Sequence, residues 1–336
     1  MRLKPTVADR FVSEMLRICP QLMDINETKN AGDDLIMMYT TDNAAYATPS
    51  LPVGCVSLWS RWRNCRHVYR FDNELVSELE RMTPCGSMPI KALELLPYPI
   101  VFVKARIYVP MWSGNKVEVP GFFAWTDGED PIRSLAILPI GQTTPLLIEL
   151  RHDTFDKVID ELCRYDGYMR DDIARNHGED KVVKLADDYE TLVRRYVGCV
   201  INLLLYIVAD NSDQDVVYRP STGRKRKGKS SDSTVHDVGT RIGRALGQAR
   251  VRYERTGNRL GGTVRPHMRA GHWHHHWVGP RDDRKLALRW HAPVFVNACD
   301  KETVTTIHDG RGLCASQGYI AGARGTASYS GSTART

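Results

Sequence analysis

YPIVFVKARIYVP (residues 98–110) opens a stretch of the chain whose pattern changes from helical to strand-like. Three further runs of the same kind follow it, at 117–127, 133–140 and 145–150. Each run is short and rich in β-branched and aromatic residues, and Gly, Pro, Asn and Asp separate one run from the next, as turns require. The four runs predict four antiparallel strands connected as a meander.

Helical patterns precede these strands. Near the start of the chain, Val7, Phe11, Met15 and Ile18 have the spacing that places them on one face of a helix. A further helix is predicted after Asp72, whose carboxylate is placed to accept a hydrogen bond from the first turn.

Helical patterns also follow the strands, from Asp153 onward. The segment 182–209 ends in the apolar run YVGCVINLLLYIVA at 196–209, which is 14 residues long. A membrane span needs about 20 residues, so this run predicts a buried core helix and no membrane partner. Helices on both sides of a meander predict an α+β domain over residues 1–212.

Charge is divided unevenly along the chain. Residues 219–291 contain 18 Lys or Arg and 5 Asp or Glu, a balance of +13, while the whole chain carries +6. The rest of the chain is therefore net acidic. Such a basic block beside an acidic body is typical of a polyanion-binding region, and a solvated charged face has the same composition.

A basic flexible linker is predicted over residues 213–237. Its sequence from 219 onward lacks apolar anchors and concentrates Lys, Arg, Gly and Ser. The segment 301–336 has hardly any apolar periodicity and is expected to be disordered. The basic linker residues expected to bind RNA are Arg224, Lys225, Arg226, Lys227 and Lys229.

A small basic module is predicted between these two segments, over 238–300. It begins with a short basic helix and has strand-like runs at 285–290 and 293–297. Because the predicted elements of 1–212 can bury one another, we expect that domain to fold without the module.

Six of the eleven histidines of the chain lie inside this module, in a stretch of 25 residues. They include His272, His274 and His276 of the sequence GHWHHHW, which an extended strand would place on one face. Neighbours two apart on a strand lie about 6–7 Å from each other, too far for three of them to share one tetrahedral ion without a bend. A zinc-stabilised module is thus the third of three interpretations, and we assign no metal ligands and no cofactor.

Catalysis is a second interpretation of the same cluster. A neutral imidazole can accept the proton of a 2′-hydroxyl and a protonated one can donate to the leaving oxygen, as in a metal-independent ribonuclease. His267, His272 and His274 supply the acid, the base and an orienting group, with Arg265 or Arg269 on the phosphate.

Binding without chemistry is the remaining interpretation. Arginines neutralise phosphates, and indole rings stack on unpaired bases. The alternative for the tryptophans is that they fill the core of the module while the histidines bond its turns. Spacing alone leaves binding and catalysis open. The module residues expected to bind RNA are Arg265, Arg269, Trp273, Trp277, Arg289 and Trp290.

Cysteine usage and the N-terminus bear on the compartment. The eight cysteines are scattered and form no C-x-x-C pair, which favours a reduced protein with ordinary thiols. The sequence MRLKPTVADRFVSEM carries charges where a signal peptide has an apolar core, so we expect a cytoplasmic protein.

The C-terminal pattern RPHxRxGHWHxxWxG, followed by RW and VFVN, resembles the signature of a known family. This is the type V-A anti-CRISPR family of mobile genetic elements that blocks production of the type V-A effector nuclease. The matching residues are Arg265, Pro266, His267, Arg269, Gly271, His272, Trp273, His274, Trp277, Gly279, Arg289, Trp290 and 294–297.

The resemblance implies recognition of the nuclease's nascent N-terminal peptide and translation-dependent loss of its messenger RNA. We therefore expect residues 1–212 to bind the nascent peptide and residues 219–297 to engage RNA or the ribosome. Whether the protein cuts RNA itself or recruits a host ribonuclease is left open by the resemblance, and so is its status as an enzyme.

Overall fold

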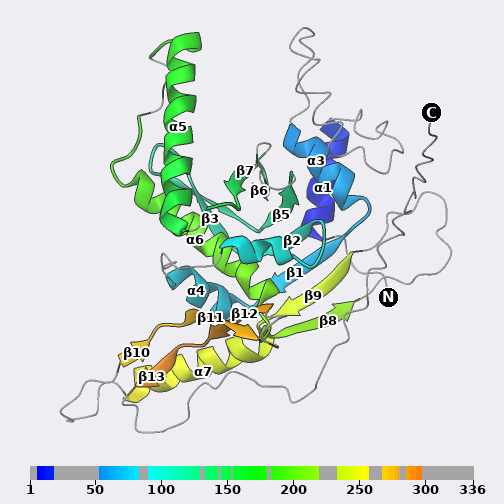
Figure 1. Cartoon of the computed structure of the whole chain (residues 1–336), viewed down its shortest axis with the longest axis vertical. Helices are drawn as coiled ribbons and strands as arrows, with labels where there is room; N and C mark the ends of the chain where they lie inside the picture. Colours follow the sequence, from blue (N-terminus) through cyan, green and yellow to red (C-terminus); the bar gives the residue numbers. More distant parts are fainter. Residues whose placement is uncertain are drawn as a thin grey trace, which may run out of the picture. The chain divides into compact units, whose positions relative to one another are not determined.

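A seven-stranded mixed sheet with the strand order β7-β6-β5-β2-β1-β9-β8 forms the centre of the computed structural model (Figure 1). The structure describes residues 6–18, 53–82, 90–128, 133–142, 145–152, 154–179, 182, 184–218, 233–256, 267–278, 280 and 285–296. The strands of the sheet are β1 (His67–Phe71), β2 (Val101–Lys104), β5 (Phe122–Asp127), β6 (Ser134–Pro139), β7 (Leu146–Glu149), β8 (Gln214–Tyr218) and β9 (Thr234–Val238).

The predicted α+β class is confirmed, whereas the predicted meander is wrong in its connections. β2, β5, β6 and β7 pair antiparallel in that order. However, each of the first two predicted runs divides into two strands, and β3 (Ile107–Pro110) and β4 (Lys116–Val119) form a separate hairpin between β2 and β5. A Cβ at Gly121 would lie 2.3 Å from the carbonyl oxygen of Val103, so only glycine permits the close approach at which β5 begins.

β8 and β9 correct the prediction of a continuous linker over 213–237. β9 pairs parallel with β1 along five residues, and β8 pairs antiparallel with β9. All of β8 and all but the last residue of β9 thus lie within the range expected to be flexible, and the linker residues 219–232 between them lie outside the described residues. The sheet is complete only with residues that follow the predicted 1–212 domain.

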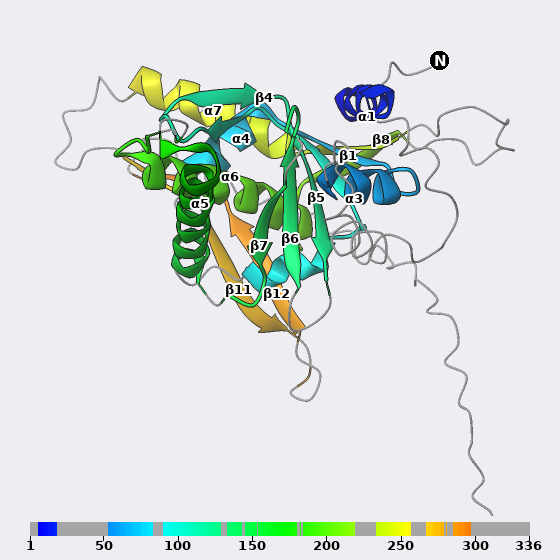
Figure 2. The ribbon, with the colours of Figure 1, turned by 90° about the horizontal axis from the view of Figure 1, so that it is seen from above.

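Helices cover both faces of the sheet (Figure 2). On one face lie α1 (Val7–Ile18) and α3 (Val53–Trp62), which pack on alternate strand residues such as Phe102 and Phe123. The residues between them on the same strands, such as Val103 and Phe122, face the other side of the sheet. The helices that share the hydrophobic core on that side are α4 (Asn73–Arg81), the 3-10 helix η3 (Ile90–Leu95), α5 (Phe155–His177), α6 (Tyr189–Val208) and α7 (Thr240–Thr256).

Two helix predictions are confirmed. Asp72 caps α4, because its side chain accepts a hydrogen bond from the N–H of Glu74 across 2.9 Å. The apolar helix α6 is a core helix, with nearly every residue from Leu192 to Ile207 buried. By length and composition α6 is also the one described helix that could cross a membrane, but 78% of its apolar window is buried inside the protein.

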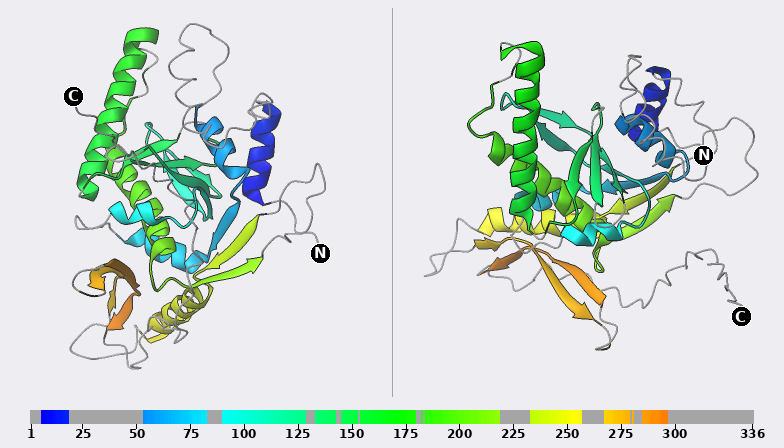
Figure 3. Two further views of the ribbon diagram at one scale, coloured as in Figure 1. Left: turned by 45° about the vertical axis from the view of Figure 1, so that its right-hand side comes forward. Right: turned by 45° about the horizontal axis from the view of Figure 1, so that its top comes forward.

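The C-terminal strands form two further small sheets, coloured amber to orange in Figure 3. β10 (His267–Arg269) pairs with β13 (Val294–Val296), and β11 (His272–Val278) pairs with β12 (Lys285–His291). The strands predicted at 285–290 and 293–297 are thereby confirmed. These strands, like the central sheet, lie within the compact unit 1–306, and the unit 307–336 lies outside the described residues.

Candidate functional site

The antiparallel β11–β12 pair sorts the histidine and tryptophan residues onto two faces. His272 pairs with His291, Trp273 with Trp290, and His274 with Arg289. Successive side chains of a strand point to opposite faces, so the tryptophans share one face and the other four residues share the opposite face. We call His272, His274, Arg289 and His291 the histidine face; all four are exposed.

Trp290 belongs to the hydrophobic core. Its side chain is 2% exposed, and its ring meets that of Tyr206 edge to face with centroids 5.4 Å apart. Its indole N–H donates to the Sδ of Met82 across 3.2 Å. The prediction that Trp290 stacks on RNA bases is therefore wrong, because protein atoms already enclose both faces of its ring.

Trp273 anchors the hairpin beside it. The ring is partly buried, and its indole N–H donates to the Oδ1 of Asn202 on α6 across 2.9 Å. The backbone of the facing strand is also held by hydrogen bonds. The side chain of Asn211 accepts from the N–H of Trp290 at 2.9 Å and donates to the carbonyl of Trp290 at 2.8 Å. Neither asparagine was predicted from the sequence, since a single asparagine carries no local pattern, whether it is buried in an apolar helix like Asn202 or lies in the turn after that helix like Asn211.

The rings of the histidine face lie close together. His272 and His291 stack with centroids 5.1 Å apart and an interplanar angle of 11°. His274 meets His291 edge to face at 5.6 Å. Imidazole rings beside a guanidinium can stack on bases, bond phosphate oxygens and exchange protons near neutral pH. Arg289 extends this set from the facing strand.

His267 does not share a strand pair with the two other predicted catalytic histidines. It pairs with Val296 in the β10–β13 sheet, as Arg269 pairs with Val294. The structure therefore groups His272 and His274 with His291 rather than with His267. Trp277 lies opposite Leu286 on the hairpin, and its side chain is outside the described part. The predicted RNA-binding residues outside the described ranges altogether are Arg224, Lys225, Arg226, Lys227, Lys229 and Arg265.

The basic helix predicted after the linker is α7, and it packs directly on the body. A Cβ at Gly243 would lie 2.0 Å from the Oδ1 of Asp72, so the glycines of α7 allow a close contact with the start of α4. Arg241 pairs with the buried Asp213 at 2.6 Å, and Arg250 pairs with Glu74 at 2.8 Å. Two arginines of this helix thus hold it to the body.

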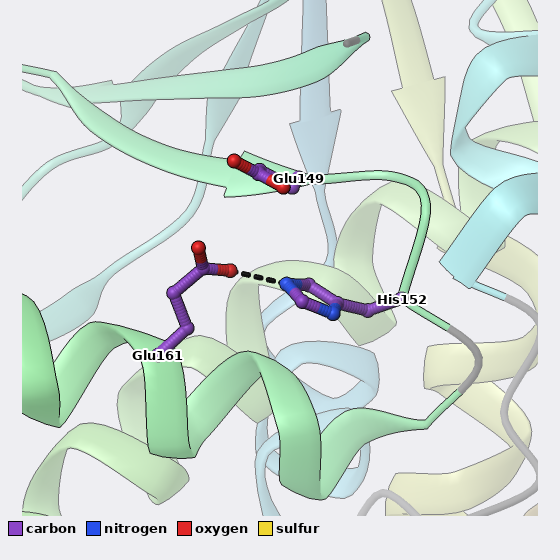
Figure 4. Close-up of side chains that lie close together, drawn as sticks. All are labelled: Glu149, His152 and Glu161. Carbon is purple, nitrogen blue, oxygen red and sulfur yellow. Dashed lines mark hydrogen bonds and ion pairs between the residues drawn. The ribbon is translucent and has the colours of Figure 1, made fainter. Parts of the chain in front are cut away.

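A set of groups able to hold a metal ion lies away from the hairpin. The atoms that Glu149, His152 and Glu161 could offer to a metal ion all lie within 4.8 Å of one another (Figure 4). Across the described ranges, the hairpin histidines form no such group. The described side chains therefore give the zinc-stabilised interpretation of the hairpin no support.

Comparison with known proteins places the chain in a class that acts against CRISPR immunity. The family model AcrVA2-like, described as the anti-CRISPR type V subtype A2 family, matches residues 69–298, from within β1 to just after β13. The chain belongs to this family, which confirms the resemblance seen in the sequence and the context of mobile genetic elements.

The chain was also compared with solved structures and with curated proteins. The structure described as "Crystal structure of AcrVA2" has 19% sequence identity to this chain and a TM-score of 0.48, and the match covers 86% of this chain and 94% of that one. No curated protein matches.

Proposed function

We propose that this anti-CRISPR protein lowers production of a type V-A CRISPR nuclease by binding the nascent N-terminal peptide and causing loss of the message. The observation that carries the proposal is the histidine face, which is exposed to solvent although its strands are anchored in the core by Trp273 and Trp290. Exposed side chains on a rigid support suit recognition of a partner better than they suit stability.

The RNA-directed part of the proposal rests on chemistry and charge. Arg289 can pair with a phosphate, and the rings of His272, His274 and His291 can stack on unpaired bases. The segment 219–291, to whose sequence this face belongs, carries a balance of +13, which favours a polyanionic partner such as messenger or ribosomal RNA. These features support RNA or the ribosome as the partner of the C-terminal region.

The peptide-directed part rests on the β8 edge of the central sheet, which directly follows the range 1–212 to which the sequence assigned peptide binding. β8 is an edge strand, and its residues Val216 and Val217 are both exposed. An edge strand offers unpaired backbone groups to an extended peptide, and adjacent apolar side chains offer it contact area. A nascent N-terminal peptide is extended when it emerges, so it is a suitable occupant for this edge.

A catalytic ribonuclease is the second candidate function. It is favoured by the stacked pair His272 and His291, because two imidazoles beside Arg289 can supply a base, an acid and a phosphate ligand. In this version His291 takes the role that the sequence analysis gave to His267. Recruitment of a host ribonuclease replaces catalysis if the purified protein cuts no RNA.

A reconstituted translation system tests the proposal with three messages. The first encodes the nuclease, the second encodes the same peptide with synonymous codons in its first 20 positions, and the third encodes a different N-terminal peptide. We expect the protein to cause loss of the first two messages and to spare the third. Loss of all three would exclude peptide recognition, and loss of only the first would show that the protein reads RNA sequence.

The same system separates the two candidate functions. A ribonuclease should cut the naked message, and His272→Ala should abolish cutting while leaving the fold intact. A recruiter should act only when translating ribosomes and host ribonucleases are both present.

A further inference from the structure

The connection between β7 and α5 brings together three side chains that neither the fold nor the proposed function requires. Glu149 is the last residue of β7, His152 lies in the connection, and Glu161 lies in the second turn of α5. Thr154 caps α5 by accepting from the N–H of Lys157, which fixes where this helix starts. In Figure 4 the His152 ring and the Glu161 carboxylate point toward each other beneath Glu149.

The donor set is that of a transition metal site. One imidazole nitrogen and two carboxylate oxygens are ligands that zinc accepts, with one position left for water. The three ligand atoms lie within 4.8 Å of one another, and ligands around tetrahedral zinc lie about 3.4 Å apart, so the separation is close to that of a zinc site. We propose that Glu149, His152 and Glu161 bind one divalent transition metal ion, with zinc as the best match.

The surroundings of the three ligands fit this proposal. The ligand side chains are 28%, 17% and 27% exposed, in the order Glu149, His152, Glu161, so an ion can enter from solvent and keep a water ligand. Both carboxylates also lie beside arginines: Arg151 Nε contacts Glu149 Oε2, and an Arg164 nitrogen lies 4.0 Å from the Oε1 of Glu161. Such outer partners orient carboxylates and neutralise charge that the ion does not.

Without metal, two of the three groups contact each other. His152 Nε2 contacts Glu161 Oε2 directly, and binding of the ion would replace this contact by two metal–ligand bonds. A His152–Glu161 contact with no further role predicts no affinity for metal, whereas the proposed site predicts that metal stabilises the folded chain by joining α5 to the sheet. These two predictions can be told apart by measurement.

The experiment uses the full chain, treated with a chelator and then dialysed. Isothermal titration with zinc chloride at neutral pH should show one ion per chain, and the melting temperature should rise with zinc. Glu161→Gln and His152→Ala should each weaken binding by more than about 100-fold, since loss of outer partners alone costs 10–100-fold. Circular dichroism of both variants establishes that they remain folded.

Two controls distinguish this site from other zinc ligands. The double variant His272→Ala/His274→Ala tests the hairpin and should bind zinc as the original chain does. Glu190→Gln removes an exposed carboxylate of α6, and its affinity should be unchanged. The proposal is overturned if no stoichiometric binding is seen, or if the hairpin variant loses zinc while Glu161→Gln retains it.

Discussion

Trp273 on β11 donates its indole N–H to the side-chain oxygen of Asn202 on α6, across 2.9 Å. Asn202 is fully buried, and its side-chain nitrogen donates to the carbonyls of Leu79 at 2.9 Å and Met82 at 3.2 Å. One amide group thus joins β11, α6 and the end of α4. Because Trp273 lies between His272 and His274 in the chain, this bond fixes the histidine face to the core.

Replacement of Asn202 tests this connection. Asn202→Ala leaves two buried carbonyls and one indole N–H without partners, and each unsatisfied buried group costs about 1–3 kcal/mol. We expect the free energy of unfolding to fall by about 3 kcal/mol or more, measured by denaturant titration. Asn176→Ala is the matched control, because that asparagine is exposed on α5 and should change stability by less than about 0.5 kcal/mol. Equal denaturation midpoints for Asn202→Ala and Asn176→Ala would contradict the conclusion that Asn202 joins β11 to the core.

Tyr196 and Tyr189 on α6 form a second matched pair. The hydroxyl of Tyr196 is buried and has no hydrogen-bond partner among the described residues, and burial raises the pKa of this phenol. Tyr196→Phe should therefore leave stability unchanged or raise it by about 1 kcal/mol. Tyr189 donates to Asp166 Oδ2 across 2.7 Å, so Tyr189→Phe should lower stability by about 1 kcal/mol. Destabilisation by Tyr196→Phe would indicate a partner such as a bound water.

Substitutions on the histidine face should lower RNA affinity without changing the stability of the fold. Arg289→Ala removes an exposed charge, so the free energy of unfolding should stay within about 0.5 kcal/mol of the original. If Arg289 contacts a phosphate, RNA affinity should fall and the slope of log affinity against log salt should decrease by about one unit. Arg175→Ala on α5 is the control, because it removes the same charge from an exposed site far along the chain. RNA affinity that is independent of salt would exclude phosphate contacts.

Truncation tests where the folding unit ends. Removal of all residues after Asp213 deletes β8, β9 and α7, so β1 loses one of its two parallel neighbours and Asp213 loses Arg241 and the N–H groups of α7. We expect no cooperative unfolding transition for this fragment, contrary to the independent 1–212 domain predicted from sequence. Truncation after Asp300 keeps every described element and should unfold cooperatively. A cooperative transition for the shorter fragment would restore the sequence-based division.

Local patterns determined much of this protein. Short runs rich in β-branched and aromatic residues predicted the strands around Phe122 and Ile137, apolar composition predicted the core helix α6, and the Asp72 cap was predicted by position alone. These features depend on neighbours within a few residues, so the sequence contains them. The C-terminal signature was likewise enough to identify the anti-CRISPR family, which the match over 69–298 confirms.

Long-range pairing was decided only by the tertiary structure. β9 joins β1 although about 165 residues separate them in the chain, and a parallel pair has no turn signal between its strands. The alternation along GHWHHHW separates Trp273 from His272 and His274, but it does not say which face is buried. Asn202, Met82 and Tyr206, which lie on other elements, determine which face is buried. Their contacts with Trp273 and Trp290 place the tryptophans in the core and leave the histidines exposed to solvent.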